Sequence, residues 1–151
     1  MKTKNLPPKG ECSDQIRSFA RALQPLLGDL RWFQNRNYLA TKKGSDFLLN
    51  YASCELIGPG GYVPSDSIIV GIILLGPDLF YPLHAHPAIE TYFVLSGHAG
   101  WQRGNEEWMI RPPGTFILHP SLIPHAMHMG EEPLLALYVW REHLTIAPHF
   151  L

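Results

Sequence analysis

Short apolar segments separated by proline and glycine fill the chain from about residue 46 onward, and this pattern constrains the fold more than any other feature. The chain has 14 prolines and 13 glycines, most of them in this part. Short apolar runs bounded by turn-forming residues are typical of β-strands. Strands are predicted at residues 49–56, 68–75, 90–95, 99–103, 107–110, 115–118, 125–129 and 134–140. A series of this kind predicts a β-sandwich or a closed barrel.

The beginning of the chain has a helical pattern instead. From Ser13, apolar residues recur at steps of three and four, as on one face of an amphipathic helix. Ser13 or Asp14 can cap this helix, and Pro25 should divide it because the proline ring clashes with the preceding turn. We therefore expect a helical segment at residues 1–45, packed outside a barrel formed by residues 46–151, with both parts in one structural domain.

Composition excludes several classes of partner. With 151 residues, 46% of them hydrophobic, the chain has the size of one globular domain. A net charge of -1 and a pI near 6.7 provide no basic surface for nucleic acid. No apolar run is long enough for a secretory signal or a membrane span, so we expect a cytoplasmic protein without a membrane partner. Cys12 and Cys54 form no CxxC pair and are expected to be reduced thiols.

Histidines are concentrated in one part of the predicted barrel, with six of the eight between positions 84 and 128. Alternate side chains of an extended segment share a face, so His84 and His86 can converge on one ion. Glu90 follows four residues later. Two imidazoles and a carboxylate suit Zn, Fe(II), Mn, Ni or Co. A His-x-His pair alone is more often structural than metal-binding, so the wider pattern has to decide.

That wider pattern resembles the first motif of the cupin superfamily. His84 and His86 are followed at the motif's spacing by Glu90 and Gly97, although the leading glycine of the motif is missing.

A match to the second cupin motif begins at Gly114 and continues through Pro120 to His125. Leu122 replaces a glycine of the motif and Met129 replaces an asparagine, which puts a turn in doubt but not the histidine. The resemblance implies a mainly β fold, a single cupin with a double-stranded β-helix or jelly-roll barrel. It also implies one divalent cation, Fe2+, Zn2+ or Mn2+, held by His84, His86, Glu90 and His125.

Two tyrosines, Tyr81 and Tyr92, bracket the first motif. The resulting pattern Tyr-x2-His-x-His-x3-Glu-x-Tyr resembles that of the cupin-type dimethylsulfoniopropionate (DMSP) lyases. The likeness continues through Trp101, Trp108 and the closing run 134–141. It implies a carbon–sulfur lyase that eliminates dimethyl sulfide from DMSP, or acts on a related small carboxylate, and leaves acrylate.

Roles for individual residues follow from this chemistry. Tyr92 should share the strand face of Glu90 and is the expected general base, because a nearby cation lowers the pKa of a tyrosine. Tyr81 is placed near the site by the resemblance only. Aromatic faces suit a sulfonium cation, and Tyr138 is favoured among the candidates Tyr138, Trp101, Trp108 and Trp140. The other histidines are not expected to be ligands. His98 and His119 are placed in turns, His119 because Pro120 follows it, and His128 is expected on the opposite strand face from His125. His143 and His149 are assigned to a polar tail.

Two alternative functions stay open. The same ligands could serve a cupin dioxygenase or isomerase acting on another small molecule, and oxygen consumption would identify a dioxygenase. A non-catalytic ligand-binding cupin is the other alternative, although tyrosines on both sides of the ligands argue against it. In each case the partner is a small molecule, and the fold is compatible with a homodimer formed through edge strands.

Overall fold

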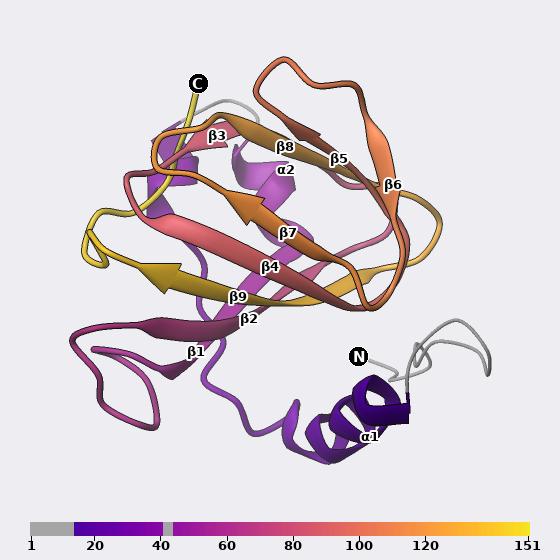
Figure 1. Ribbon diagram of the computed structural model, residues 1–151, viewed down its shortest axis with the longest axis vertical. Coiled ribbons are helices and arrows are strands. Elements are labelled where there is room, and N and C mark those ends of the chain that lie inside the picture. Colours follow the sequence, from indigo (N-terminus) through magenta and orange to yellow (C-terminus); the bar gives the residue numbers. More distant parts are fainter. Residues whose placement is uncertain (1–13, 41–43) are drawn as a thin grey trace.

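The computed structural model describes residues 14–40 and 44–151, which form two antiparallel five-stranded β-sheets facing each other (Figure 1). The first sheet contains β1 (Tyr51–Ile57), β2 (Ile69–Leu75), β9 (Leu134–Arg141), β4 (Ile89–Ser96) and β7 (Phe116–His119), in this spatial order. The second sheet contains β10 (His149–Phe150), β3 (Phe80–Ala85), β8 (His125–Met129), β5 (Ala99–Arg103) and β6 (Met109–Arg111). The mainly β barrel predicted from the sequence is confirmed.

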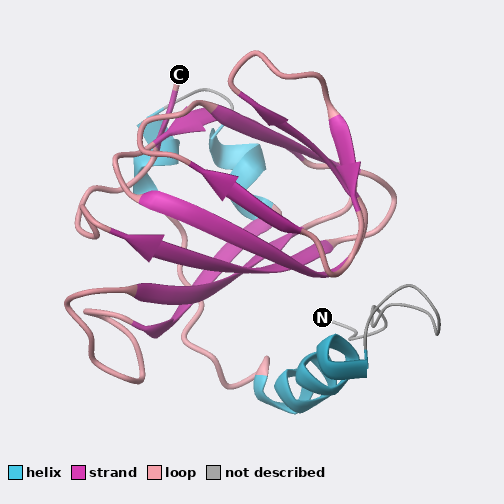
Figure 2. Cartoon of the chain, in the orientation of Figure 1, coloured by secondary structure: helices cyan, strands magenta, loops and turns pink. Residues whose placement is uncertain are grey.

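The helices are short (Figure 2), and they precede the strands in the chain. They are α1 (Asp14–Leu23), the 3-10 helices η1 (Gln24–Leu26) and η2 (Arg36–Ala40), and α2 (Gly44–Leu49). Pro25 lies in the first turn of η1, so the helical pattern divides where the proline was expected to divide it. Within the described residues, no helix is long and apolar enough to span a membrane.

Helix α1 lies outside the barrel, as predicted (Figure 1). Its last residue, Leu23, is buried in a small apolar cluster with Ile72 of β2 and Leu95 of β4. Since Leu135 and Leu137 of β9 pack against the same cluster, α1 covers the outer face of the first sheet.

The main core lies between the two sheets. Along β9, residues at alternate positions are buried, which is the pattern of a strand with one face toward a core. The buried residues of β9 are Leu134, Ala136, Tyr138 and Trp140. Tyr38 and Phe47, which precede the first strand, belong to the same core. The ring of Tyr38 stacks on Phe150 of β10 with 4.1 Å between centroids.

The eight predicted strands are present, and each end lies within two residues of its expected position. Two further strands, β3 and β10, were not predicted. Pro82 lies inside β3 and has no N–H for the ladder, and the register to β8 shifts between Tyr81 and His84. The short strand β10 pairs with β3, so His149 is part of the second sheet rather than of a polar tail.

The turn that the second motif left in doubt forms without its glycine. Leu122 adopts a left-handed backbone conformation, with φ of 60°, at the glycine position of the motif. This conformation costs a residue other than glycine about 1 kcal/mol or more. The backbone N–H of Leu122 donates to the carbonyl of His86 over 2.9 Å, so the turn is anchored to a residue of the candidate site.

Candidate active site

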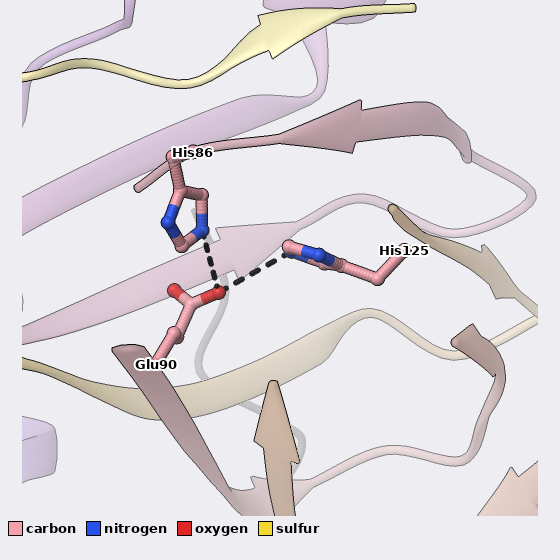
Figure 3. Close-up of side chains that lie close together, drawn as sticks. All are labelled: His86, Glu90 and His125. Atoms are coloured by element: carbon pink, nitrogen blue, oxygen red, sulfur yellow. Dashed lines mark hydrogen bonds and ion pairs between the residues drawn. The ribbon is translucent and has the colours of Figure 1, made fainter. Parts of the chain in front are cut away.

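Three of the four expected metal ligands meet between the two sheets (Figure 3). His86 follows β3, Glu90 lies on β4 and His125 begins β8. One ligand atom from each lies within 4.8 Å of the others, and all three residues are buried. Glu90 Oε2 is 3.1 Å from His86 Nε2 and 3.3 Å from His125 Nε2. This group can hold a metal ion.

Each of the motif histidines is oriented by a backbone carbonyl two residues away. The Nδ1 atom of His84 lies 2.8 Å from the carbonyl of Pro82. The Nδ1 atom of His86 lies 3.1 Å from the carbonyl of Ala88, and that of His125 lies 3.0 Å from the carbonyl of Ile123. Because a carbonyl only accepts, each Nδ1 carries the proton, and each Nε2 is left for the interior.

Two ring nitrogens and a carboxylate oxygen at these distances need positive charge between them, either protons on the imidazoles or a metal cation. Burial acts to raise the pKa of Glu90, but hydrogen bonds with His125 and His86 outweigh it and hold the pKa well below its usual value. The Glu90 carboxylate is therefore ionised. Its other oxygen, Oε1, accepts a hydrogen bond of 2.6 Å from Nε1 of Trp140.

His84, the fourth expected ligand, lies beside this group rather than within it. Its ring is 4.0 Å from that of His125, but His84 does not belong to the set of ligand atoms within 4.8 Å. Burial, followed by the neighbouring His125, lowers the pKa of His84 well below its usual value, so its imidazole is neutral. The ring of Tyr81 stacks on that of His84 with 4.0 Å between ring centroids.

Both candidate bases are buried near the ligands. Burial and the charge of Glu90 raise the pKa of Tyr92 well above the usual value of tyrosine. Burial and the neighbouring Tyr38 also raise the pKa of Tyr81 well above the usual value. Either phenol therefore needs added positive charge nearby before it can lose its proton near neutral pH.

A cavity of about 320 Å³ connects these residues with the surface. Its wall contains His84, His86 and Glu90, both tyrosines of the motif, and the aromatic rings of Tyr138 and Trp140. At its mouth lie residues that precede β1 or follow β9, among them Arg36 and Thr145. The cavity has the size of a site for a small organic molecule.

The two tryptophans proposed for the substrate pocket do not line this cavity. Trp101 is buried behind Tyr92, with 4.9 Å between ring centroids, and faces a separate cavity of about 70 Å³. Trp108 is 44% exposed and contacts Phe80 on the outside of the barrel. Among the aromatic candidates, the structure brings only Tyr138 and Trp140 to the cavity.

His119 is a site neighbour that sequence reasoning placed in a turn. It lies instead on β7, opposite Glu90 in the ladder to β4, and it is 1% exposed. Its ring is 3.9 Å from that of His125, and neither ring nitrogen has a hydrogen-bond partner among the described residues. Burial lowers the pKa of His119 to about 3, so this imidazole is also neutral.

A group of hydroxyls behind Tyr81 was also not predicted. The hydroxyls of Tyr38 and Tyr81 share a hydrogen bond of 2.5 Å. Tyr51 lies beside Tyr81, and its own hydroxyl accepts a hydrogen bond of 3.0 Å from Ser53. The contacts of Tyr81 with Tyr38 and Tyr51 join residues far apart in the chain, which no local motif could indicate.

This chain is similar to known proteins in both sequence and structure. A family profile of dimethylsulfoniopropionate lyases matches residues 5–136. The DMSP lyase DddQ of Ruegeria pomeroyi is 38% identical over 111 residues, which cover 74% of this chain and 55% of that protein. The chain spans about half the length of the curated relatives it matches.

The crystal structure of DddQ from Ruegeria pomeroyi superposes with a TM-score of 0.85 at 30% identity, over 99% of this chain and 72% of that one. A cupin-like protein from Thermotoga maritima aligns over 68% of this chain and 76% of its own, with a TM-score of 0.58 and 17% identity. That second likeness concerns the fold alone, and it confirms the predicted cupin barrel.

Proposed function

Because this chain belongs to the dimethylsulfoniopropionate lyase family, we propose that it is a metal-dependent carbon–sulfur lyase that converts DMSP, or a closely related carboxylate, into dimethyl sulfide and acrylate. The observation that carries the proposal is the convergence of His86, Glu90 and His125. Two of these residues, His86 and Glu90, line the same cavity as Tyr92 and Tyr138.

The metal ligands in this proposal are His86, Glu90 and His125, with His84 as the fourth. The Nδ1 contacts support this assignment, because they leave the Nε2 atoms of the histidines free to bind a cation. A bound divalent cation would hold the substrate carboxylate and stabilise the negative charge that develops as the α-proton leaves. Fe2+, Zn2+ and Mn2+ all suit nitrogen and oxygen ligands of this kind.

Tyr92 is the proposed base, with Tyr81 as the alternative. The base takes the proton from the α-carbon, and the electrons of that C–H bond form the C=C bond of acrylate. The bond from the β-carbon to sulfur breaks, and its electrons leave with neutral dimethyl sulfide. Burial raises the pKa of Tyr92 well above its usual value, so we expect elimination to depend strictly on a cation that counteracts this effect.

Tyr138 is the proposed contact for the sulfonium group. It lines the cavity and is 8% exposed, and an aromatic face attracts a cation that offers no N–H or O–H donor. Trp101 and Trp108 are not included, because neither lines the cavity. Cytoplasmic location and a homodimer stay predictions from the sequence.

The test is headspace detection of dimethyl sulfide from purified protein given DMSP. The protein is reloaded in turn with Fe(II), Mn(II) and Zn(II), and a chelated sample is the control. Metal-dependent release is the expected result. Absence of dimethyl sulfide with every metal, despite a bound cation, would contradict the proposal and favour another small carboxylate or oxygen chemistry.

Two variants separate base from ligand. Tyr92→Phe should keep the bound metal but lose elimination, with a fall in kcat of about a hundredfold or more. His125→Ala should lose both, because it removes one of the three convergent ligand atoms. Metal content and dimethyl sulfide release are measured on the same samples. Full activity in Tyr92→Phe would remove Tyr92 from the mechanism, and Tyr81→Phe would then be the variant expected to lose elimination.

A further inference from the structure

A second carboxylate, that of Glu55, lines the cavity. Glu55 on β1 pairs with Gly71 on β2, Gly71 pairs with Tyr138 on β9, and Tyr138 pairs with Tyr92 on β4. Directly opposite residues of antiparallel strands project to the same face of a sheet. Glu55, Gly71, Tyr138 and Tyr92 therefore form one row across four strands on the face toward the cavity, with Glu55 at the end away from Glu90 and the other ligands.

The glycine in this row leaves room for the tyrosine beside it. A Cβ atom at Gly71 would overlap the phenol end of Tyr138, at its Cζ and hydroxyl oxygen. The Tyr138 ring therefore lies over Gly71 and reaches toward β1, the strand that carries Glu55. The negative charge of Glu55 is among the influences that raise the pKa of Tyr138, after burial and Tyr51, which agrees with this proximity.

The charge of Glu55 has no cationic partner within the described part of the chain. Its Oε1 accepts a hydrogen bond of 2.7 Å from the backbone N–H of Gly60, which accounts for one oxygen. The nearby Arg31 lies instead over the ring of Tyr62, 4.3 Å from its centroid. The other charged residues lining the cavity are Glu90, at the metal ligands, and Arg36.

We propose that Glu55, together with the face of Tyr138, forms the subsite for the positively charged end of the substrate. A zwitterion would then place its carboxylate at the metal ligands and its cationic group at the opposite end of the row. The subsite selects charged over neutral substrates of the same shape, because a partly buried carboxylate such as Glu55 attracts a cation more strongly than a fully solvated one would. This inference rests on the proposed function for the placement of the carboxylate end.

The test compares two ligands of equal shape and different charge. β-Alanine betaine carries a trimethylammonium group, and its tert-butyl analogue has carbon in place of nitrogen. Their dissociation constants are measured by calorimetry on the metal-loaded wild type and on Glu55→Gln. The glutamine keeps an oxygen that can accept from Gly60, so the variant removes the charge and retains the turn.

Wild-type protein should prefer the betaine, and Glu55→Gln should bind the betaine about tenfold more weakly, with the neutral analogue unchanged. Asp66→Asn is the matched control, since Asp66 is exposed and does not line the cavity, and it should leave both constants unchanged. Circular dichroism and metal content verify that each variant is folded and loaded.

An equal loss of both ligands in Glu55→Gln would overturn the inference and assign Glu55 a purely structural role in the turn. An unchanged preference for the betaine would overturn it as well. Dimethyl sulfide release by the wild type distinguishes this failure from failure of the proposed function. Release with an unchanged preference refutes the Glu55 subsite alone, and a charge-dependent preference without release supports the subsite and refutes the lyase reaction.

Discussion

The orientation of the candidate ligands is determined by contacts of very short range. Each of the three motif histidines has its Nδ1 atom within 3.1 Å of a carbonyl two residues away, on a segment that also contains a proline or a bend. Such local contacts explain why a sequence motif with fixed spacing could predict the site. The position of His119 has a different origin, because its burial depends on the pairing of β7 with β4. The proline that follows it indicated a turn instead.

Trp140 is predicted to affect metal affinity although it offers no ligand atom. Its Nε1 donates to Glu90 Oε1 over 2.6 Å, and its ring stacks on His86 with 4.4 Å between centroids. Trp140→Phe removes the donor and keeps an aromatic ring, so the carboxylate loses the bond that orients it. We expect metal affinity to fall about tenfold, as measured by competition with a chelator.

Trp32→Phe is the matched control for this prediction. The Nε1 atom of Trp32 donates to the carbonyl of Leu27 over 2.8 Å, in the cluster on the outer face of the first sheet. The same chemical change at this position should leave metal affinity unaltered. A tenfold loss in both variants would indicate a general effect on stability rather than orientation of Glu90.

At the scale of elements, the strands that form short apolar runs between turn residues could be predicted, and β3, the strand that carries His84, could not. Strands β5 and β8 match the expected residues at both ends. In β3, Pro82 interrupts the ladder and the register shifts before His84. A proline inside an apolar run argues against a strand, so the rule that found the other strands excluded this one. The irregularity lies directly beside the candidate metal site.

Gly71, the glycine in the row of residues across β1, β2, β9 and β4, leaves the space that the Tyr138 ring occupies. Gly71→Ala should destabilise the fold by about 1–3 kcal/mol, because the added methyl group would overlap the phenol of Tyr138 and force it away from β1. The same displacement should raise KM for the substrate. Urea unfolding measures the first effect and steady-state kinetics the second.

Gly100→Ala provides the comparison for this variant. Gly100 also lies in a strand, β5, but a Cβ atom there would meet its nearest neighbour, on Trp108, at an ordinary 3.5 Å. The alanine should be tolerated, because replacing glycine by alanine lowers the conformational entropy of the unfolded chain and so favours the folded state. Equal destabilisation by the two substitutions would show that the Tyr138 contact is not the cause.

At the scale of the whole molecule, the segment before the first strand contributes to the barrel as well as covering it. Tyr38, from η2, contacts both Phe150 of β10 and Tyr81, the tyrosine that stacks on His84. Phe47, from α2, joins the same aromatic group. A boundary near residue 45 reflects the change of sequence pattern but not this packing. Contacts of this separation along the chain leave no periodicity in the sequence, so only the assembled fold reveals them.

The burial of two neutral histidines, His84 and His119, makes the metal-free protein sensitive to acid. Burial lowers the pKa of His119 to about 3 and that of His84 well below its usual value. Below about pH 6.5 both histidines take up protons in the unfolded chain, while the folded protein keeps them neutral. The unfolded state therefore gains stability as the pH falls. Glu90 also favours the unfolded state below about pH 4.3. Its carboxyl takes up a proton in the unfolded chain there, while it stays ionised in the folded protein.

We therefore predict that the free energy of unfolding decreases by up to about 1.4 kcal/mol per pH unit for each of these histidines as the pH falls from about 6.5 to 5. Urea unfolding in the presence of a chelator measures this slope. His119→Leu should reduce it by the contribution of one histidine, because leucine takes up no proton in either state. The control is His143→Leu in an exposed turn, which should keep the wild-type slope. A constant free energy of unfolding over this interval would contradict the prediction. It would show that the interior histidines accept protons while the protein stays folded, as they would if water reached His84 and His119 through the cavities that they line.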